Sequence, residues 1–189
     1  MSIIALWVLV LFETTLLLLL LRVLGDLRQR GSISSKEGTY ALEEWGLPIG
    51  EKAPSFVVKD ETGKTIRFED FRGKRRIITF ISPECHACST TIEALNEFQR
   101  GKRAIALLVI GELDRESNLA YARKNNAQMP ILTPQRDLAM EVYRCRAIPF
   151  TFILDEDGII RAKDLTTDGE ALEMLLEAAF GHSLDAISL

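Results

Sequence analysis

The chain begins with an apolar stretch that a domain of this size could not bury. Residues 3–24 read IIALWVLVLFETTLLLLLLRVL. As a helix, these 22 residues would be about 33 Å long, enough to cross the roughly 30 Å hydrocarbon core of a bilayer. A helix that is apolar on all sides would need a larger protein than this 189-residue chain to hide it. The sequence therefore predicts one N-terminal transmembrane helix, in an anchor over residues 1–24.

The apolar stretch differs from a cleaved signal peptide and from a lipoprotein signal. It follows Met1-Ser2 rather than a basic segment, and neither a small-residue cleavage site nor a closely spaced cysteine comes after it. We therefore expect the anchor to be retained.

Glu13 lies near the middle of this stretch, beside Thr14 and Thr15. An ionised carboxylate at the centre of a bilayer costs roughly 2.5 kcal/mol or more. Two interpretations stay open: the carboxyl is protonated and tolerated in a very apolar helix, or it faces a partner helix within the membrane.

The rest of the chain divides into a linker and a domain. Residues 25–46 carry little apolar periodicity and indicate a juxtamembrane linker, so the domain is predicted over residues 47–189. The net charge of −4 provides no global basic surface, and no nucleic-acid partner is expected.

Strand-like and helix-like segments alternate within the domain. The β-branched and apolar runs RIITFI at 76–81 and AIALLVI at 104–110 are typical of buried strands. Further strands are expected at 55–59, 64–68, 151–154 and 159–162, and helices at 85–100, 115–126, 135–143 and 168–180, the last ended by Gly181. This order predicts an α/β domain with a central mixed β-sheet and helices on both faces.

Two of the three cysteines, Cys85 and Cys88, fall between the strand at 76–81 and the helix expected at 85–100. The positive end of a helix favours a thiolate and can lower a cysteine pKa from about 8.5. Residues three apart share a helix face, so the two sulfurs could close and open a disulfide. A protonated His86 would stabilise the thiolate further, whereas Glu84 would oppose it.

Other uses of the cysteine pair fit the sequence less well. A zinc site needs four ligands, and only Cys145, His86 and His182 remain to complete one. A purely structural disulfide across so short a loop would stabilise little, and two buried hydrophobic cysteines at such a junction would be unusual. A redox dithiol is therefore favoured. It needs no cofactor and no metal, since the dithiol itself carries two electrons.

Two segments resemble a known family. GEKAPSFVVKDETGKTIRFEDFRGKRRIITFISPECHAC at 50–88 and YRCRAIPFTFILDEDGII at 143–160 are similar to the membrane-anchored TlpA-like thiol–disulfide oxidoreductases. The Ser-Pro-x-Cys-x-x-Cys form is closest to the MauD branch, the methylamine-utilisation accessory proteins. The resemblance covers residues 47–180 and implies a thioredoxin-like (redoxin) fold and a protein thiol–disulfide oxidoreductase.

The resemblance also implies roles for individual residues. Cys85 would be the attacking nucleophile and Cys88 the more buried resolving thiol, the two forming the redox disulfide. Pro149 would follow a cis peptide bond, face the cysteine pair and shape the substrate groove. His86 and Ala87 between the cysteines, and Glu84 before them, depart from common family patterns. These departures leave the direction of electron flow open.

Two readings of Cys145 remain open. Its position four residues before Pro149 favours a core residue, and the alternative is a third redox thiol that exchanges with Cys88.

The expected partners are a cysteine-containing client protein, a membrane electron-transfer partner and the bilayer itself, through residues 3–24. Two other functions compete. A thiol peroxidase of the redoxin type would use Ser82 and Cys85, but Ile78 stands where that site needs proline. A non-catalytic thioredoxin scaffold would bind a membrane partner through the anchor.

The charges around the anchor and the resemblance predict opposite orientations. Basic residues follow the apolar stretch (Arg22, Arg28, Arg30 and Lys36) and none precedes it, which favours a cytoplasmic domain. The resemblance implies an extracytoplasmic, periplasmic domain. Because long domains can translocate despite flanking charge, we expect the second orientation.

Overall fold

The computed structural model describes residues 13, 15, 45–101 and 104–181. The chain divides between residues 44 and 45 into two units, and the domain that begins at Trp45 is the unit described below. The expected anchor, apart from Glu13 and Thr15, and most of the expected linker lie outside the described residues. Within the described part of the chain, no helix has the length and apolar character needed to cross a membrane.

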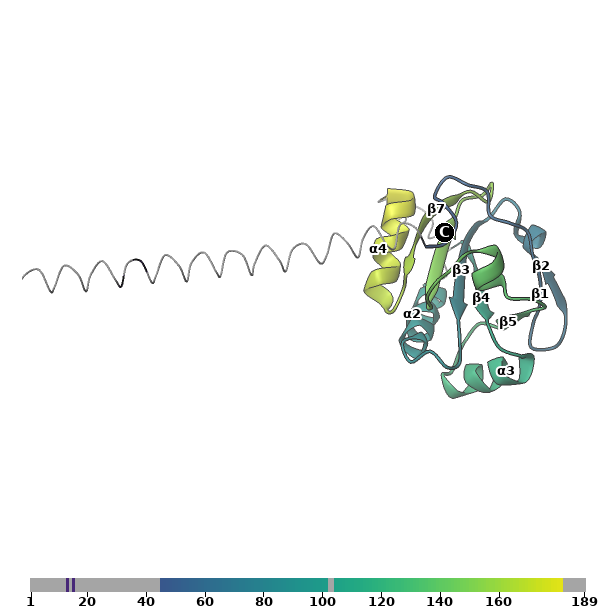
Figure 1. Ribbon diagram of the computed structural model, residues 1–189. Coiled ribbons are helices and arrows are strands. Elements are labelled where there is room, and N and C mark those ends of the chain that lie inside the picture. Colours follow the sequence, from purple (N-terminus) through teal and green to yellow (C-terminus); the bar gives the residue numbers. More distant parts are fainter. Residues whose placement is uncertain (1–12, 14, 16–44, 102–103, 182–189) are drawn as a thin grey trace, which may run out of the picture. The chain divides into compact units, whose positions relative to one another are not determined.

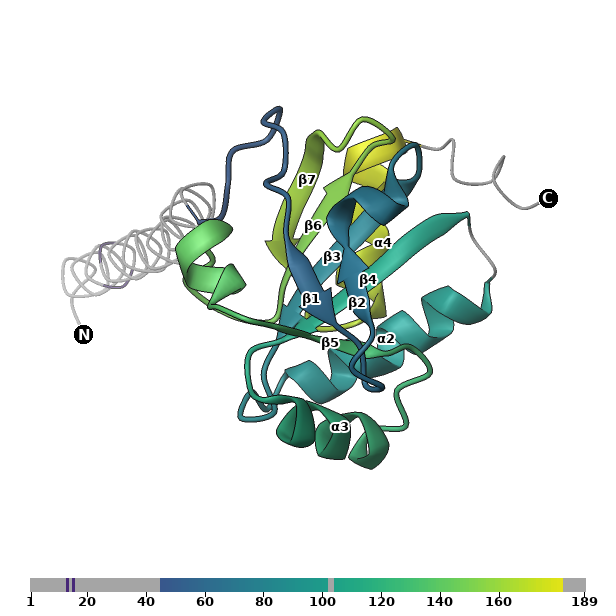
Figure 2. The same ribbon diagram turned by 90° about the vertical axis from the view of Figure 1, so that its right-hand side faces the viewer.

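The domain is built on one mixed β-sheet (Figures 1 and 2). Its described strands are β1 (Val57–Lys59), β2 (Thr65–Arg67), β3 (Arg75–Ile81), β4 (Ile105–Gly111), β5 (Ile131–Pro134), β6 (Phe150–Leu154) and β7 (Ile160–Leu165), in the order β2-β1-β5-β4-β3-β6-β7. The central strands β3, β4 and β5 run parallel, and the pairings that involve β1, β2, β6 or β7 are antiparallel. The predicted mixed sheet is therefore confirmed.

Three α-helices accompany the sheet: α2 (Cys88–Arg100), α3 (Arg115–Lys124) and α4 (Gly169–Phe180). The side chains of Asp114 and Asp168 accept hydrogen bonds from backbone N–H groups in the first turns of α3 and α4, which satisfies donors that a helix leaves unpaired. Gly181, with a φ of 64°, ends α4 as predicted.

The two faces of the sheet are covered differently. Alternate residues of β3 point to opposite faces, with Ile77 and Ile81 on one side and Ile78 and Phe80 on the other. All three α-helices pack on the side of Ile77 and Ile81. Two short turns, the 3₁₀-helix η1 (Phe68–Phe71) and the π-helix η2 (Leu138–Val142), lie on the side of Phe80. The predicted helices on both faces are therefore confirmed only in part, because all three α-helices cover one face and only the short η1 and η2 lie on the other.

The segment 131–143 differs most from the sequence prediction. No strand was predicted at Ile131–Pro134, but it forms β5, pairing in parallel with β4 and antiparallel with β1. The helix predicted at 135–143 was wrong in extent, because only η2 forms, closed by the Tyr143 N–H donating to the Leu138 carbonyl. Residues 135–137 are not helical, and the Asp137 side chain caps the turn by accepting a hydrogen bond from the Met140 N–H, so the helix begins only at Leu138.

Candidate active site

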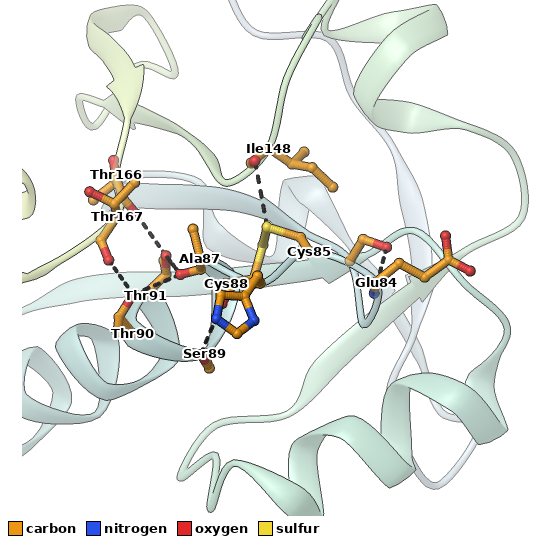
Figure 3. Close-up of a disulfide and its surroundings, with 12 residues drawn as sticks. Glu84, Cys85, Ala87, Cys88, Ser89, Thr90, Thr91, Ile148, Thr166 and Thr167 are labelled. Carbon is orange, nitrogen blue, oxygen red and sulfur yellow. Dashed lines mark hydrogen bonds between the residues drawn. A yellow bond between two sulfur atoms is a disulfide. The ribbon is translucent and has the colours of Figure 1, made fainter.

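The register of the sheet brings the two predicted motifs together. Phe80 of β3 lies opposite Phe150 of β6, so the loop that follows β3 and the loop that precedes β6 emerge side by side. The first loop carries Cys85, and the second carries the Ile148–Pro149 peptide bond, which is cis. The Cys85 Sγ lies 3.6 Å from the carbonyl oxygen of Ile148 (Figure 3).

Cys85 and Cys88 form a disulfide, with their Cα atoms 5.4 Å apart. The two sulfurs differ in environment: Cys88 is fully buried at 0% exposure among the apolar side chains beneath α2, whereas Cys85 is only half-buried. A molecule approaching from solvent would therefore reach Cys85 first.

The prediction that Cys85 begins the helix was wrong. The helix α2 begins at Cys88, with Ala87 as its N-cap residue, and Cys85 precedes it in a turn. In that turn, the Cys85 N–H donates to the Ser82 carbonyl (3.0 Å) and the Cys88 N–H donates to the Cys85 carbonyl (3.2 Å). The strand β3 ends at Ile81, shortly before Pro83, and residues 82–87 form the turn that precedes the helix.

The predicted tuning residues lie beside the disulfide and are exposed. His86 and Glu84 both face solvent, and the Glu84 N–H is bonded to the Ser82 hydroxyl at 3.3 Å. The effect of His86 on the pKa of the cysteines stays a prediction.

Glu112 is a residue near this loop that the sequence interpretation missed. It follows β4, and its N–H donates to the carbonyl of Ile81, the last residue of β3 (3.0 Å). Partial desolvation raises the pKa of the Glu112 carboxyl, and the nearby carboxylates of Asp137 and Glu84 raise it further. The carboxyl ends of adjacent parallel strands meet at one sheet edge, so Glu112 could be identified only once β3 and β4 were known to be neighbours.

Thr91, in the first turn of α2, was also missed. Its hydroxyl reaches the carbonyl of Thr166 in the segment after β7, and the hydroxyl of its exposed neighbour Thr90 reaches that of Thr167 (Figure 3). Thr91 lies three residues after Cys88, and this spacing could have indicated that the two side chains share a helix face.

Cys145 lies in the core on the opposite face of the sheet, at 2% exposure, and is not part of a disulfide. Burial raises the pKa of its thiol to about 12, and the carboxylates of Glu112 and Asp137 act in the same direction. The neighbouring Arg144 and Arg146 are exposed and do not reverse this. The structure thus favours the core reading of Cys145.

Of the residues weighed for a zinc site, His182 lies outside the described residues. Across residues 45–101 and 104–181, no three His, Cys, Asp or Glu side chains are grouped closely enough to hold a metal ion.

Comparison with known proteins gives a consistent result. Residues 49–163, more than half of the chain, match the model of the AhpC/TSA family. The chain belongs to the AhpC/TSA family. The methylamine utilization protein MauD of Paracoccus denitrificans is 29% identical over 178 residues, which cover 93% of this chain and 86% of that relative. The thiol-disulfide oxidoreductase ResA of Geobacillus thermodenitrificans is 26% identical over 152 residues, covering 79% and 83%.

Within the AhpC/TSA family, the fold is that of thioredoxin. The crystal structure of the thioredoxin domain of a thiol-disulfide oxidoreductase from Bacteroides vulgatus matches with a TM-score of 0.60 at 22% identity, covering 69% of this chain and 96% of that domain. The relatives that the chain matches thus include MauD and the thiol-disulfide oxidoreductase ResA, and the matching solved structure is a thioredoxin domain. The family resemblance predicted from the two sequence motifs is therefore confirmed.

Proposed function

We propose that this protein is a membrane-tethered oxidoreductase that exchanges disulfides with cysteine-containing client proteins through Cys85 and Cys88. One observation carries the proposal: a half-buried Cys85 is bonded to a fully buried Cys88, directly beside the carbonyl of Ile148. A buried sulfur cannot meet a protein client, whereas the more exposed one can.

The chemistry follows from this difference in access. In the reduced protein, the Cys85 thiolate attacks one sulfur of a client disulfide, forming a mixed disulfide and releasing the other client sulfur as a thiolate. The Cys88 thiolate then attacks the Cys85 Sγ, which breaks the mixed disulfide and releases the second client sulfur. Two electrons pass to the client, and its two sulfurs take up the protons that the dithiol has lost. The reverse sequence oxidises a client dithiol.

The segment around Pro149 is proposed to form one wall of the client groove. Pro149 is buried, and Ala147 and Ile148 before it are partly exposed beside Cys85. A client chain bonded to Cys85 would therefore lie against Ile148 and Pro149.

Residues 1–24 are proposed to anchor the protein in the bilayer through residues 3–24, with residues 25–46 as linker and 47–189 as the redoxin domain. The match to MauD supports this division, because it covers 93% of the chain and therefore extends beyond the described domain. We place the domain on the periplasmic side, where it would mature a secreted or periplasmic enzyme and receive or pass electrons through a membrane partner. Glu13 is the residue proposed to contact such a partner.

Thiol peroxidase activity is a second candidate, because the chain belongs to the AhpC/TSA family. The site argues against it. Ile78, in the place of the proline that a peroxidase site needs, is a buried residue of β3. Consumption of hydrogen peroxide by the reduced full-length protein at a rate above that of free thiols would favour the peroxidase.

A trapping experiment tests the proposal. The full-length Cys88→Ala variant, expressed in its membrane, keeps the attacking sulfur but cannot resolve the mixed disulfide. It should accumulate disulfide-linked clients that a reducing agent releases. The Cys85→Ala/Cys88→Ala double variant is the matched control and should capture none. Equal capture by both variants, or by neither, would contradict client exchange and favour the non-catalytic scaffold.

Protease treatment of intact spheroplasts tests the orientation. A periplasmic domain should be digested without lysis, and protection until the membrane is broken would reverse the assignment.

A further inference from the structure

A series of hydrogen bonds connects α2 to the loop that carries Pro149, and Figure 3 shows its two ends, at Thr91 and at Ile148. The hydroxyl of Thr91 lies 2.7 Å from the carbonyl oxygen of Thr166. The N–H of Thr166 donates to the carbonyl of Pro149 at 3.3 Å, continuing the pairing of β6 with β7. The preceding carbonyl, that of Ile148, faces the Cys85 Sγ at 3.6 Å. The helix that carries one cysteine is thus bonded to the loop that contacts the other.

The hydrogen bond between Thr91 and Thr166 is completely buried. Thr91 and Thr166 are both 0% exposed, and they lie where α2 packs on an otherwise apolar face of the sheet. The single hydroxyl proton of Thr91 has two acceptors within reach, and the Thr166 carbonyl at 2.7 Å is nearer than the Ala87 carbonyl at 3.2 Å. Because no water reaches this buried pair, removing the hydroxyl would leave the Thr166 carbonyl without this donor and without a solvent replacement.

Thr90 provides a natural comparison. Its hydroxyl makes a similar pair of contacts, to the Ala87 carbonyl at 2.8 Å and to the Thr167 carbonyl at 2.6 Å, but its side chain is exposed. Water can replace those contacts. Thr167 also lies one residue beyond the Thr166 N–H that bonds to Pro149.

We propose that Thr91 is a positioning residue for disulfide exchange: through Thr166, its hydroxyl fixes the Ile148–Pro149 loop against the sulfur of Cys85. The effect of Thr91 on disulfide exchange rests on the proposed oxidoreductase function, whereas the hydrogen bonds that connect Thr91 to the loop do not.

The proposal has two physical consequences. In the reduced protein, the Cys85 thiol can donate to the Ile148 carbonyl, and a hydrogen bond to the protonated form raises the pKa of a thiol. Loosening the loop therefore lowers the pKa of Cys85. A client chain also needs the loop in a fixed place, whereas a small disulfide does not, so loosening slows exchange with proteins selectively.

The experiment compares three variants of the full-length protein. Thr91→Val removes the hydroxyl and keeps the side-chain shape, Thr91→Ser keeps the hydroxyl, and Thr90→Val is the matched control. For each reduced variant, the pH dependence of Cys85 alkylation by iodoacetamide is followed by mass spectrometry. Rates of reduction are measured for insulin and for hydroxyethyl disulfide.

Thr91→Val should slow insulin reduction about fivefold relative to hydroxyethyl disulfide, the effect expected of one lost hydrogen bond, and should shift Cys85 alkylation to lower pH. Thr91→Ser and Thr90→Val should match the wild type in both. An unchanged rate ratio together with an unchanged alkylation profile in Thr91→Val would overturn the proposal, as would an equal effect of Thr90→Val. If the wild type reduces no insulin, the proposed function fails, but the alkylation profile still decides the role of Thr91.

Discussion

The two faces of the sheet hold cysteines of opposite character. On the face covered by α2, α3 and α4, Cys88 is buried but is bonded to Cys85, which sits in a turn at the end of β3. On the other face, Cys145 lies among aromatic side chains, with its N–H bonded to the Ala139 carbonyl at 2.8 Å. Its Sγ has the Tyr143 carbonyl within 4.0 Å, and the structure gives it no partner sulfur.

This difference arises from position and not from residue type. Cys85 and Cys88 stand where a strand gives way to a helix, so the chain must turn and leave one sulfur near solvent. Cys145 stands in the segment between η2 and β6, and it belongs to the same buried core as the rings of the aromatic cluster, which comprises Phe56, Phe68, Phe80, Tyr143, Phe150 and Phe152. A thiol buried in apolar surroundings stays protonated and unreactive, whereas a partly exposed one can exchange.

The largest expected effect separates the two kinds of cysteine by activity. Cys85→Ser should reduce insulin reduction to the uncatalysed rate, because no accessible sulfur remains to attack. Cys145→Ala should keep the wild-type rate, because a buried thiol takes no part in the exchange. Rates are measured with the full-length protein and a reducing agent. Loss of activity in Cys145→Ala, with folding intact by circular dichroism, would make Cys145 part of the redox path and end the contrast.

The second prediction concerns the stability of the aromatic face. The ring of Phe152 is fully buried, with its centroid 5.1 Å from that of Phe150 and 5.2 Å from that of Tyr143. Phe152→Ala should lower the free energy of unfolding by about 3–5 kcal/mol, because it leaves a cavity in a packed core. Phe71→Ala, at the partly buried rim of the same cluster, should cost clearly less. Denaturant titration measures both, and equal losses would show that the cluster is not tightly packed.

The parts of the fold that the sequence predicted are those with strong local patterns. The β-branched runs of β3 and β4, the hairpin of β6 and β7, and the capped helix α4 all appear. The strand β5 was missed because its four residues end in proline, and only pairing with Val109 and Val58 defines it as a strand. That pairing is tertiary, and no local pattern encodes it.

The candidate site shows the same division. Cys85, Cys88 and Pro149 belong to motifs that the sequence displays, and the structure brings them together. Thr91 and Glu112 were not found, because their significance depends on which segments meet in space. Thr91 needs the segment after β7 beside α2, and Glu112 needs β4 beside β3. The spacing of Thr91 from Cys88 shows only that the two side chains share a helix face. The partners of Thr91 and Glu112, which are Thr166 and Ile81, depend on the tertiary fold.

The third prediction uses the titration of Cys145. Burial raises the pKa of its thiol from an ordinary value of 9.0 to about 12. The folded state therefore holds this proton when the unfolded chain has released it, and stability falls as the pH rises from about 9 towards 12. The slope contributed by one group reaches at most about 1.4 kcal/mol per pH unit. Below pH 9 the contribution is constant.

Cys145→Ala should make the decline of stability above pH 9 shallower than in the wild type. The measurement is the free energy of unfolding by denaturant at several pH values under reducing conditions. The variant also loses buried sulfur contacts, so the slope and not the absolute stability is the test. Parallel slopes in the two proteins would mean that Cys145 titrates normally and is not buried in solution.

The smallest expected effect concerns the carboxylates near the cysteine loop. The pKa of Glu112 is raised above its ordinary value of 4.5, first by partial desolvation and then by Asp137 and Glu84. The folded state therefore binds this proton more tightly than the unfolded chain does, and the stability that Glu112 contributes is lost as the pH rises above 4.5.

Glu112→Gln should accordingly raise the free energy of unfolding slightly near pH 7 and leave it unchanged below about pH 4. Because the side chain reaches solvent, the gain should be small and should shrink with added salt. Glu93→Gln, on the exposed side of α2, is the matched control and should change nothing at either pH. A gain of equal size in both variants would assign the effect to overall charge and not to the repulsion of Glu112 by Asp137 and Glu84.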